Sequence, residues 1–180
     1  TGVFTADNKT YDGTTSASIL TRSLTGVLAA DVADVTLTGG TATFATATVG
    51  AGKTVTSTGM TLGGAKAGNY NLTGVGTASA DITGLTLTGN FTVGNKVYDG
   101  TTTASILTRT LTGVLPADAA DVTLTGGLAT FNNESVANGK TVTAAGMTLG
   151  GTKAANYTLS GVNTATANIT AKDITGNFTA

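Results

Sequence analysis

The chain has 180 residues, of which 26 are Gly, one is Pro, 11% are charged and none is Cys, His or Trp. The formal net charge of −1 and the absence of a basic stripe exclude a surface for nucleic acid or anionic lipid, and the single Pro excludes collagen-like and polyproline structure. No apolar run approaches the roughly 20 residues that span a bilayer, so we expect no membrane insertion by this segment. Abundant Thr, Val, Gly and Asn are typical of strands joined by tight turns.

Short runs of alternating apolar and polar residues, bounded by Gly or Asn, predict seven or eight strands in the first half of the chain. In chain order the predicted strands are residues 3–6, 14–19, 24–27, 35–37, 42–45, 53–62, 70–75 and 77–83. Residues 29–33 have a helical spacing, but their number suffices for one turn at most. Many short strands separated by turn residues are typical of an immunoglobulin-like β-sandwich.

An internal repeat organises the chain. The segment Lys9-Thr-Tyr-Asp-Gly-Thr-Thr15 recurs as Lys96-Val-Tyr-Asp-Gly-Thr-Thr102, and the match continues without a gap at a constant offset of 87 residues, with about two thirds of the positions identical. A period of this length far exceeds one coil of a β-solenoid and suits an independent domain. We therefore predict an all-β protein of two tandem immunoglobulin-like β-sandwich domains, residues 1–87 and 88–174, with residues 175–180 beginning a third copy.

The segment that joins the two copies also alternates between apolar and polar residues, over positions 82–90. The last strand of copy one is therefore expected to run almost directly into the first strand of copy two. Such a joint lacks the Gly/Ser-rich slack of a flexible tether, so the prediction is an extended and fairly stiff array whose partners are the neighbouring repeats of the same chain.

Three blocks of the repeat resemble a known family. Lys9-Thr-Tyr-Asp-Gly-Thr-Thr15, Gly59-Met-Thr-Leu-Gly-Gly64 and Asn69-Tyr-Asn-Leu72 are similar to the YDG repeat domain of large bacterial adhesins, the filamentous-haemagglutinin-like exoproteins. The resemblance implies a tandem stalk module that lies outside a Gram-negative cell, either secreted or on its surface. A chain without Cys and with one Pro also suits folding after secretion, because it avoids mispaired disulfides and slow prolyl isomerisation.

The most distinctive residues of the repeat form an Asp-Gly turn that follows a Tyr. Gly accepts a positive φ, and Asp can bond the backbone amides beside it, so the sequence predicts a structural turn with the Tyr packed at the edge of the core. A ligand-binding Tyr–Asp pair is the alternative. The residues are Tyr11, Asp12 and Gly13 in copy one and Tyr98, Asp99 and Gly100 in copy two.

Two pairs of carboxylates three residues apart, Asp31 with Asp34 and Asp118 with Asp121, suggest calcium ligands. Calcium takes six to eight oxygen ligands, and these loops lack that density of acidic residues, so turn caps or solvated acids are favoured and no metal is predicted. Thr-x-Thr runs such as residues 36–38, 54–56 and 86–88 are similar to those of flat ice-binding faces. On a twisted sheet, however, they are expected to be ordinary outward-facing side chains.

A Lys–Asn isopeptide cross-link is a further hypothesis, because some surface adhesin sandwiches carry one. The candidates are Lys9 with Asn69 in copy one and Lys96 with Asn156 in copy two. The reaction would require a buried neutral Lys beside a protonated carboxyl group.

The sequence offers little material for catalysis. General acid–base and nucleophilic chemistry at neutral pH depend mainly on His, Cys and paired carboxylates, and the chain has no His, no Cys and a single Glu, Glu134. The sequence also lacks a Gly-rich phosphate loop ahead of a helix. We predict that the protein is not an enzyme and uses no cofactor.

The leading functional hypothesis is a structural stalk or spacer repeat of a cell-surface or secreted adhesin, which projects a distal adhesive region and supports attachment or biofilm. The alternative is a module that recognises a glycan or matrix component through loops at the end of a sandwich. Copy two would be the better binder, because Asn132-Asn-Glu-Ser135 replaces Ala45-Thr-Ala-Thr48 of copy one. Association between filaments through weakly charged edge strands is the remaining possibility.

Overall fold

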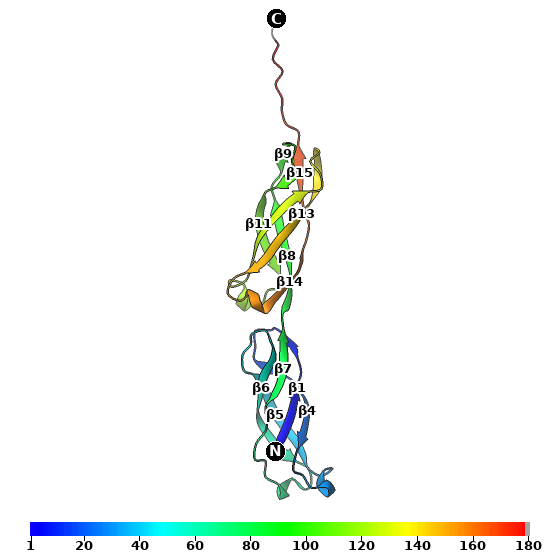
Figure 1. The fold of residues 1–180 in the computed structure, drawn as a ribbon, viewed down its shortest axis with the longest axis vertical. Coiled ribbons are helices and arrows are strands. Elements are labelled where there is room, and N and C mark those ends of the chain that lie inside the picture. Colours follow the sequence, from blue (N-terminus) through cyan, green and yellow to red (C-terminus); the bar gives the residue numbers. More distant parts are fainter. Residues whose placement is uncertain (179–180) are drawn as a thin grey trace. The chain divides into compact units, whose positions relative to one another are not determined.

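The computed structural model describes residues 1–178, and these form strands, short 3-10 turns and no α-helix. The all-β prediction is therefore confirmed. The chain divides into two compact units, unit 1 (Thr1–Leu85) and unit 2 (Thr86–Ala180). Figure 1 traces the strands of both units along the chain.

Unit 1 contains two sheets. A two-stranded sheet pairs β1 with β4, and a five-stranded sheet has the order β2-β7-β6-β5-β3. The strands are β1 (Gly2–Ala6), β2 (Lys9–Thr10), β3 (Ser16–Ala17), β4 (Ile19–Leu24), β5 (Thr36–Phe44), β6 (Gly50–Gly63) and β7 (Ala78–Thr83), with 3-10 turns at η1 (Ala29–Asp31) and η2 (Ala67–Asn69). The single predicted helical turn coincides with η1.

Unit 2 repeats this arrangement with one additional strand. Its sheets have the orders β11-β8-β14 and β10-β12-β13-β15-β9. The strands are β8 (Leu85–Val93), β9 (Lys96–Val97), β10 (Thr103–Ala104), β11 (Ile106–Thr112), β12 (Thr123–Phe131), β13 (Ala137–Gly150), β14 (Tyr157–Val162) and β15 (Ala165–Thr170), with 3-10 turns at η3 (Pro116–Asp118) and η4 (Ala154–Asn156). Only Gly84 separates β7 from β8, as the alternating pattern of this segment predicts.

Both sheets of a unit contribute side chains to one core. In unit 2, Phe91 of the smaller sheet belongs to the same buried cluster as Phe131, Val142 and Ile169 of the larger sheet. The alternation of the sequence produces this arrangement, because successive side chains of a strand point to opposite faces. In β5, for example, Leu37 is buried while the Thr residues on both sides of it are exposed.

The two predicted strands 35–37 and 42–45 form a single strand, β5, that continues through a Gly pair. Gly39 and Gly40 have φ values of 66° and 83°, a conformation that Gly adopts without the steric penalty of a side chain. Arg22 Nε donates to the carbonyl oxygen of Gly39 at 2.9 Å and so holds the irregular backbone of the strand. Gly pairs that look like turns in a sequence can therefore lie within a strand.

Three other strand predictions differ from the structure. The predicted strand 14–19 is divided between β3 and β4, and the predicted strand 24–27 ends at Leu24. Residues 70–75 make only one isolated bridge, between Val75 and Gly2, whereas the equivalent residues of unit 2 form β14. Whether this segment forms a strand therefore depends on the neighbouring strand, which is β8 in unit 2.

Candidate functional site

The Tyr-Asp-Gly turn is built around a Lys ammonium that is enclosed by oxygen atoms. In unit 1, Lys9 Nζ donates to Asp12 Oδ1 at 2.7 Å, to the Thr14 carbonyl oxygen at 2.7 Å and to Thr14 Oγ1 at 3.1 Å. The same Asp12 oxygen accepts from the Thr14 amide at 2.8 Å and from its hydroxyl at 2.9 Å. Gly13 has a φ of 77°, which closes the turn. The polar groups of Lys9, Asp12 and Thr14 are thus hydrogen-bonded to one another.

Unit 2 reproduces this geometry. Lys96 Nζ lies 2.7 Å from Asp99 Oδ1, and it also donates to the carbonyl oxygens of Thr101 at 2.7 Å and Thr103 at 3.1 Å. Gly100 has a φ of 75°. Agreement at this level between the two copies indicates that the motif encodes one fixed turn.

The electrostatics of the turn favour the ionised carboxylates. Hydrogen bonds from Lys96 and then from Thr101 lower the pKa of Asp99 from its ordinary 3.8 to about 2. Burial acts to raise the pKa of Asp12, but the hydrogen bonds from Lys9 and Thr14 outweigh it, so the pKa lies below its ordinary value. The ammonium also faces an aromatic ring in each unit, with Lys9 Nζ 5.6 Å from the centroid of Phe44.

The two Tyr residues of the motif have different surroundings. Tyr11 is buried, at 6% exposure, whereas Tyr98 is 41% exposed. In both units the backbone amide of the Tyr donates to the last residue of the neighbouring strand, Tyr11 to the carbonyl oxygen of Thr83 and Tyr98 to that of Thr170, each at 2.8 Å. The backbone position is therefore shared, while the side-chain environment is not.

A second polar cluster is formed by residues that are distant in sequence. Asp31 accepts from Lys66 Nζ at 2.7 Å and from the Tyr70 hydroxyl at 2.8 Å, and Asp34 Oδ2 lies 3.4 Å from the same ammonium. The hydrogen bonds from Lys66 and Tyr70 lower the pKa of Asp31, whereas burial followed by the bond to Asp31 raises the pKa of Tyr70. In unit 2, Asp118, Lys153 and Tyr157 repeat the cluster.

This cluster explains the paired carboxylates that the sequence analysis considered as calcium ligands. Lys66 lies between Asp31 and Asp34, and Lys153 lies between Asp118 and Asp121, so an ammonium occupies the position that a cation would take. Within residues 1–178, no group of three or more acidic, His or Cys side chains is placed to hold a metal. Lys66 and Lys153 were not singled out from the sequence, although both recur at the 87-residue offset.

The isopeptide hypothesis does not fit the arrangement of the candidate residues. Lys9 lies beside Phe44 at the end of β5, whereas Asn69 follows Lys66, whose amide bonds to the Asp34 carbonyl oxygen just before β5 begins. The nine residues of β5 separate the two ends by roughly 25 Å. In unit 2, Lys96 and Asn156 lie at the equivalent opposite ends of β12, beside Phe131 and after Lys153 respectively. The reaction would also need a neutral Lys, and both Lys side chains are paired with a carboxylate instead.

The divergent loop and the Thr-rich strands occupy exposed positions. Asn132, Asn133, Glu134 and Ser135 are all exposed, and Asn133 Oδ1 accepts from the Ser135 amide at 3.1 Å and from Lys140 Nζ. Thr residues 36, 38, 54 and 56 are exposed on either side of buried Leu37 and Val55, which confirms the outward-facing interpretation for these two runs. Facing Thr hydroxyls form cross-strand pairs, such as Thr38 with Thr61 at 3.3 Å.

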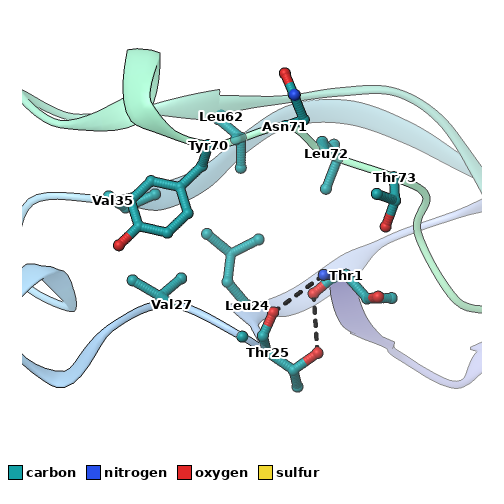
Figure 2. A pocket seen from close by; sticks show the side chains of 11 residues that line it. Thr1, Leu24, Thr25, Val27, Val35, Leu62, Tyr70, Asn71, Leu72 and Thr73 are labelled. Atoms are coloured by element: carbon teal, nitrogen blue, oxygen red, sulfur yellow. Dashed lines mark hydrogen bonds between the residues drawn. The ribbon is translucent and has the colours of Figure 1, made fainter.

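One cleft was not anticipated from the sequence. In unit 1, a cavity of about 320 Å³ lies where the chain starts, between β4 and the segment 70–73. Figure 2 shows apolar side chains gathered around it, with the Thr1 ammonium donating to the Thr25 carbonyl oxygen at 3.0 Å on its far side. The apolar lining residues are Leu24, Val27, Val35, Leu62, Tyr70 and Leu72.

The two units define a repeat protein in which one all-β module occurs twice with the same motif geometry. The family model of the YDG domain matches residues 2–82 and again residues 83–167. The chain therefore belongs to the YDG domain family. Searches of curated proteins and of solved structures gave no match. No helix within residues 1–178 is long and apolar enough to cross a membrane.

Proposed function

We propose that the chain is a structural spacer from a bacterial adhesin, on the cell surface or secreted, whose consecutive immunoglobulin-like β-sandwich repeats hold an adhesive region away from the cell. The observation that carries the proposal is that the motif residues form hydrogen bonds with one another inside each unit. Lys9, Asp12 and Thr14 bond to one another within unit 1, and Lys96, Asp99 and Thr101 do the same in unit 2. The residues that distinguish the repeat hold its turn, which is what a spacer module requires.

The joint between the repeats supports a mechanical role. Gly84 alone separates β7 from β8, and a single residue gives much less freedom than a Gly/Ser-rich linker. Each unit also has its own buried residues, such as Val55 and Ile82 in unit 1 and Val142 and Ile169 in unit 2. In this proposal reach increases with the number of repeats, and the short joint limits bending.

Small-angle X-ray scattering of the whole chain tests the spacer function. The 14 residues of β6 extend over roughly 45 Å, so two units in line give a radius of gyration of roughly 25 Å. A compact globule of this length would have a radius of gyration near 16 Å. The control is a chain with a six-residue Gly/Ser insertion after Gly84, which should broaden the distribution of dimensions. A compact value for the native chain would overturn the proposal.

Recognition of a glycan or matrix component is the second candidate, and one observation favours it. The exposed Asn132–Ser135 loop of unit 2 carries amide and carboxylate groups where unit 1 has Ala and Thr. A glycan array probed with the native chain and with a variant carrying Ala-Thr-Ala-Thr at these positions tests it, because binding through the loop would be lost in the variant. Sedimentation over a range of concentrations measures association between chains in the same samples.

A further inference from the structure

Strand β5 of unit 1 is open along most of one edge. It pairs with β6 from its first residue to its last, but on the other side it pairs with β3 only at Ala42 and Thr43. Residues 36–41 therefore have no strand partner on that side. Unit 2 repeats this arrangement, because β12 pairs with β10 only at the two equivalent residues and leaves residues 123–128 open. An open edge is a template on which another chain can add a strand.

Neither strand carries the side chains that usually protect an open edge. Natural edge strands are protected by charged residues, by Pro or by being very short. β5 and β12 each have nine residues, and their sequences include no charged residue and no Pro. Because every copy of the chain carries the same edges, a second copy always offers a matching edge, which would pair isologously.

An Arg of the facing strand lies across each open edge. Arg22 of β4 donates from Nε to the Gly39 carbonyl oxygen at 2.9 Å, and Arg109 of β11 donates to that of Gly126 at the same distance. Both Arg side chains are exposed, and within residues 1–178 neither is paired with a carboxylate. A backbone acceptor of the open segment is thus occupied, and an uncompensated positive charge lies beside it.

Each Arg also divides the groove that follows the open edge. In unit 1, a cavity of about 360 Å³ lies beside residues 40–43 of β5, and another of about 470 Å³ lies beside residues 35–37. Arg22 lines both cavities, and it bonds to β5 at Gly39, between these two sets of residues. Arg109 likewise lines two cavities of about 330 and 440 Å³. Among the described residues that line these cavities, the two Arg residues are the charged ones.

A strand added along either edge would have to cover the guanidinium. Moving a charge out of water costs free energy when no carboxylate lies beside it. Two matching edges would also bring equivalent Arg residues of the two copies together, and their like charges repel. Without the guanidinium, the two cavities of a unit would join into one groove with aliphatic walls, formed in unit 1 by residues such as Ile19, Leu24 and Val27. Burial of such walls favours association.

We propose that Arg22 and Arg109 prevent the open edges of β5 and β12 from pairing with the same edges of a second copy of the chain. Each edge is then an association surface between copies that the native chain keeps closed. The Nε bonds to Gly39 and Gly126 hold the guanidinium groups at the edge, where they oppose pairing. The proposal goes beyond the spacer function and does not depend on it.

The test compares the native chain with a double variant that carries Arg22→Ala and Arg109→Ala. Sedimentation velocity over a range of concentrations measures association, and the native chain should remain monomeric. In the Ala variant the average mass should rise about twofold as the concentration increases. Amide hydrogen exchange over residues 36–41 and 123–128 should slow at least about tenfold over the same range, because the added strand protects these amides.

A second double variant guards against loss of the fold. Arg22→Gln with Arg109→Gln removes the charge but keeps much of the side-chain stem, and it should associate in the same way. The matched control adds Thr41→Lys and Leu128→Lys to the Ala variant, since both residues are exposed, occupy equivalent positions and line the cavities. This control should be monomeric again, because Lys on an edge strand opposes pairing.

Several outcomes would overturn the proposal. One is a folded variant that lacks the Arg charges and still stays monomeric. Another is association that does not slow exchange over residues 36–41 and 123–128, or that the added Lys residues do not reverse, since the copies would then meet through another surface. A native chain that already pairs through these segments would also contradict it. Scattering of the native chain reports on the spacer function separately.

Discussion

Lys9 Nζ lies 2.7 Å from Asp12 Oδ1 in unit 1, and Lys96 repeats this contact with Asp99 at the same distance. The pair is half open to water, since the side chain of Asp12 is 51% exposed while that of Lys9 is 17% exposed. An exposed ion pair contributes little by itself, so the value of Asp12 lies mainly in its hydrogen bonds to the Thr14 amide and hydroxyl. The Asp12 carboxylate therefore stabilises the turn mainly by accepting these two hydrogen bonds.

Replacing Asp12 by Ala should lower the melting temperature of unit 1 by roughly 2–4 °C, because the Thr14 amide loses its acceptor and Lys9 loses its counter-ion. Differential scanning calorimetry of the full chain measures the shift. Asp7→Ala is the matched control, because Asp7 is exposed and lies just ahead of the same turn. An unaltered midpoint for Asp12→Ala would show that the turn does not need the carboxylate.

The turn of unit 2 should make stability depend on pH in the acidic range. Because Asp99 has a pKa of about 2 in the folded chain and an ordinary value of 3.8, the folded state favours its charged form. This contribution is fully present above the ordinary pKa, and it is lost as the pH falls from about 4 to about 2. Thermal unfolding across this range should show a smaller decrease for Asp99→Asn than for the native chain. An NMR titration midpoint near the ordinary value would contradict the assignment.

Much of the fold follows from local pattern. Alternation around Leu37 and Val55 predicts the buried faces of β5 and β6, and the Asp-Gly pairs predict the turns at Gly13 and Gly100 with positive φ. These features depend on neighbours within a few residues, and the sequence displays those neighbours directly. The 87-residue offset then extends each prediction to the second copy.

The remaining features depend on contacts between distant segments. Asn69-Tyr-Asn-Leu-Thr-Gly-Val75 and Asn156-Tyr-Thr-Leu-Ser-Gly-Val162 are nearly the same sequence, but only the second forms a strand over most of its length. The difference lies in the neighbouring strand, since β14 pairs with β8 in unit 2, whereas the equivalent segment of unit 1 makes only the bridge from Val75 to Gly2 of β1. Likewise, the separation of Lys9 from Asn69 by the length of β5 cannot be read from spacing in the sequence.

Two Gly residues of unit 2 should respond very differently to replacement by Ala. Gly100 has a φ of 75° and open space around its Cβ position, so Gly100→Ala should cost only the left-handed backbone strain of about 1 kcal/mol. Gly151 has a φ of 100°, and its Cβ would collide with the carbonyl oxygen of Asp121. We expect Gly151→Ala to lose at least about 3 kcal/mol in urea denaturation. Similar losses in the two variants would contradict this distinction.

A single hydroxyl in unit 1 should be destabilising. Among the described residues, the buried Oγ of Ser57 has no hydrogen-bond partner, and Ser57 pairs across the sheet with buried Ala42. Unit 2 has Ala144 at this position, opposite Ala129. Ser57→Ala should therefore stabilise unit 1 by about 1 kcal/mol, as measured by urea denaturation, because a buried polar group without a partner carries a desolvation penalty.

The reciprocal variant supplies the control for the Ser57 prediction. Ala144→Ser introduces the same hydroxyl in the same cross-strand environment of unit 2, so it should destabilise that unit by a similar amount. Native-state hydrogen exchange resolves the two units, using the buried strands around Val55 and Val142 as reporters. A destabilised Ser57→Ala protein would show that the hydroxyl contributes a bond in solution.

Removing the side chain of Leu87 should destabilise β8 and the neighbouring strand β14 in unit 2. Leu87→Ala deletes a fully buried aliphatic group beside Gly113, and such truncations cost about 2–5 kcal/mol. Hydrogen exchange should accelerate in β14, which lies next to β8, while protection around Val55 of unit 1 should stay unchanged. Leu107→Ala is the control, because Leu107 is 66% exposed and its loss should have little effect. If β14 kept its protection in Leu87→Ala, the strand would not depend on this side chain.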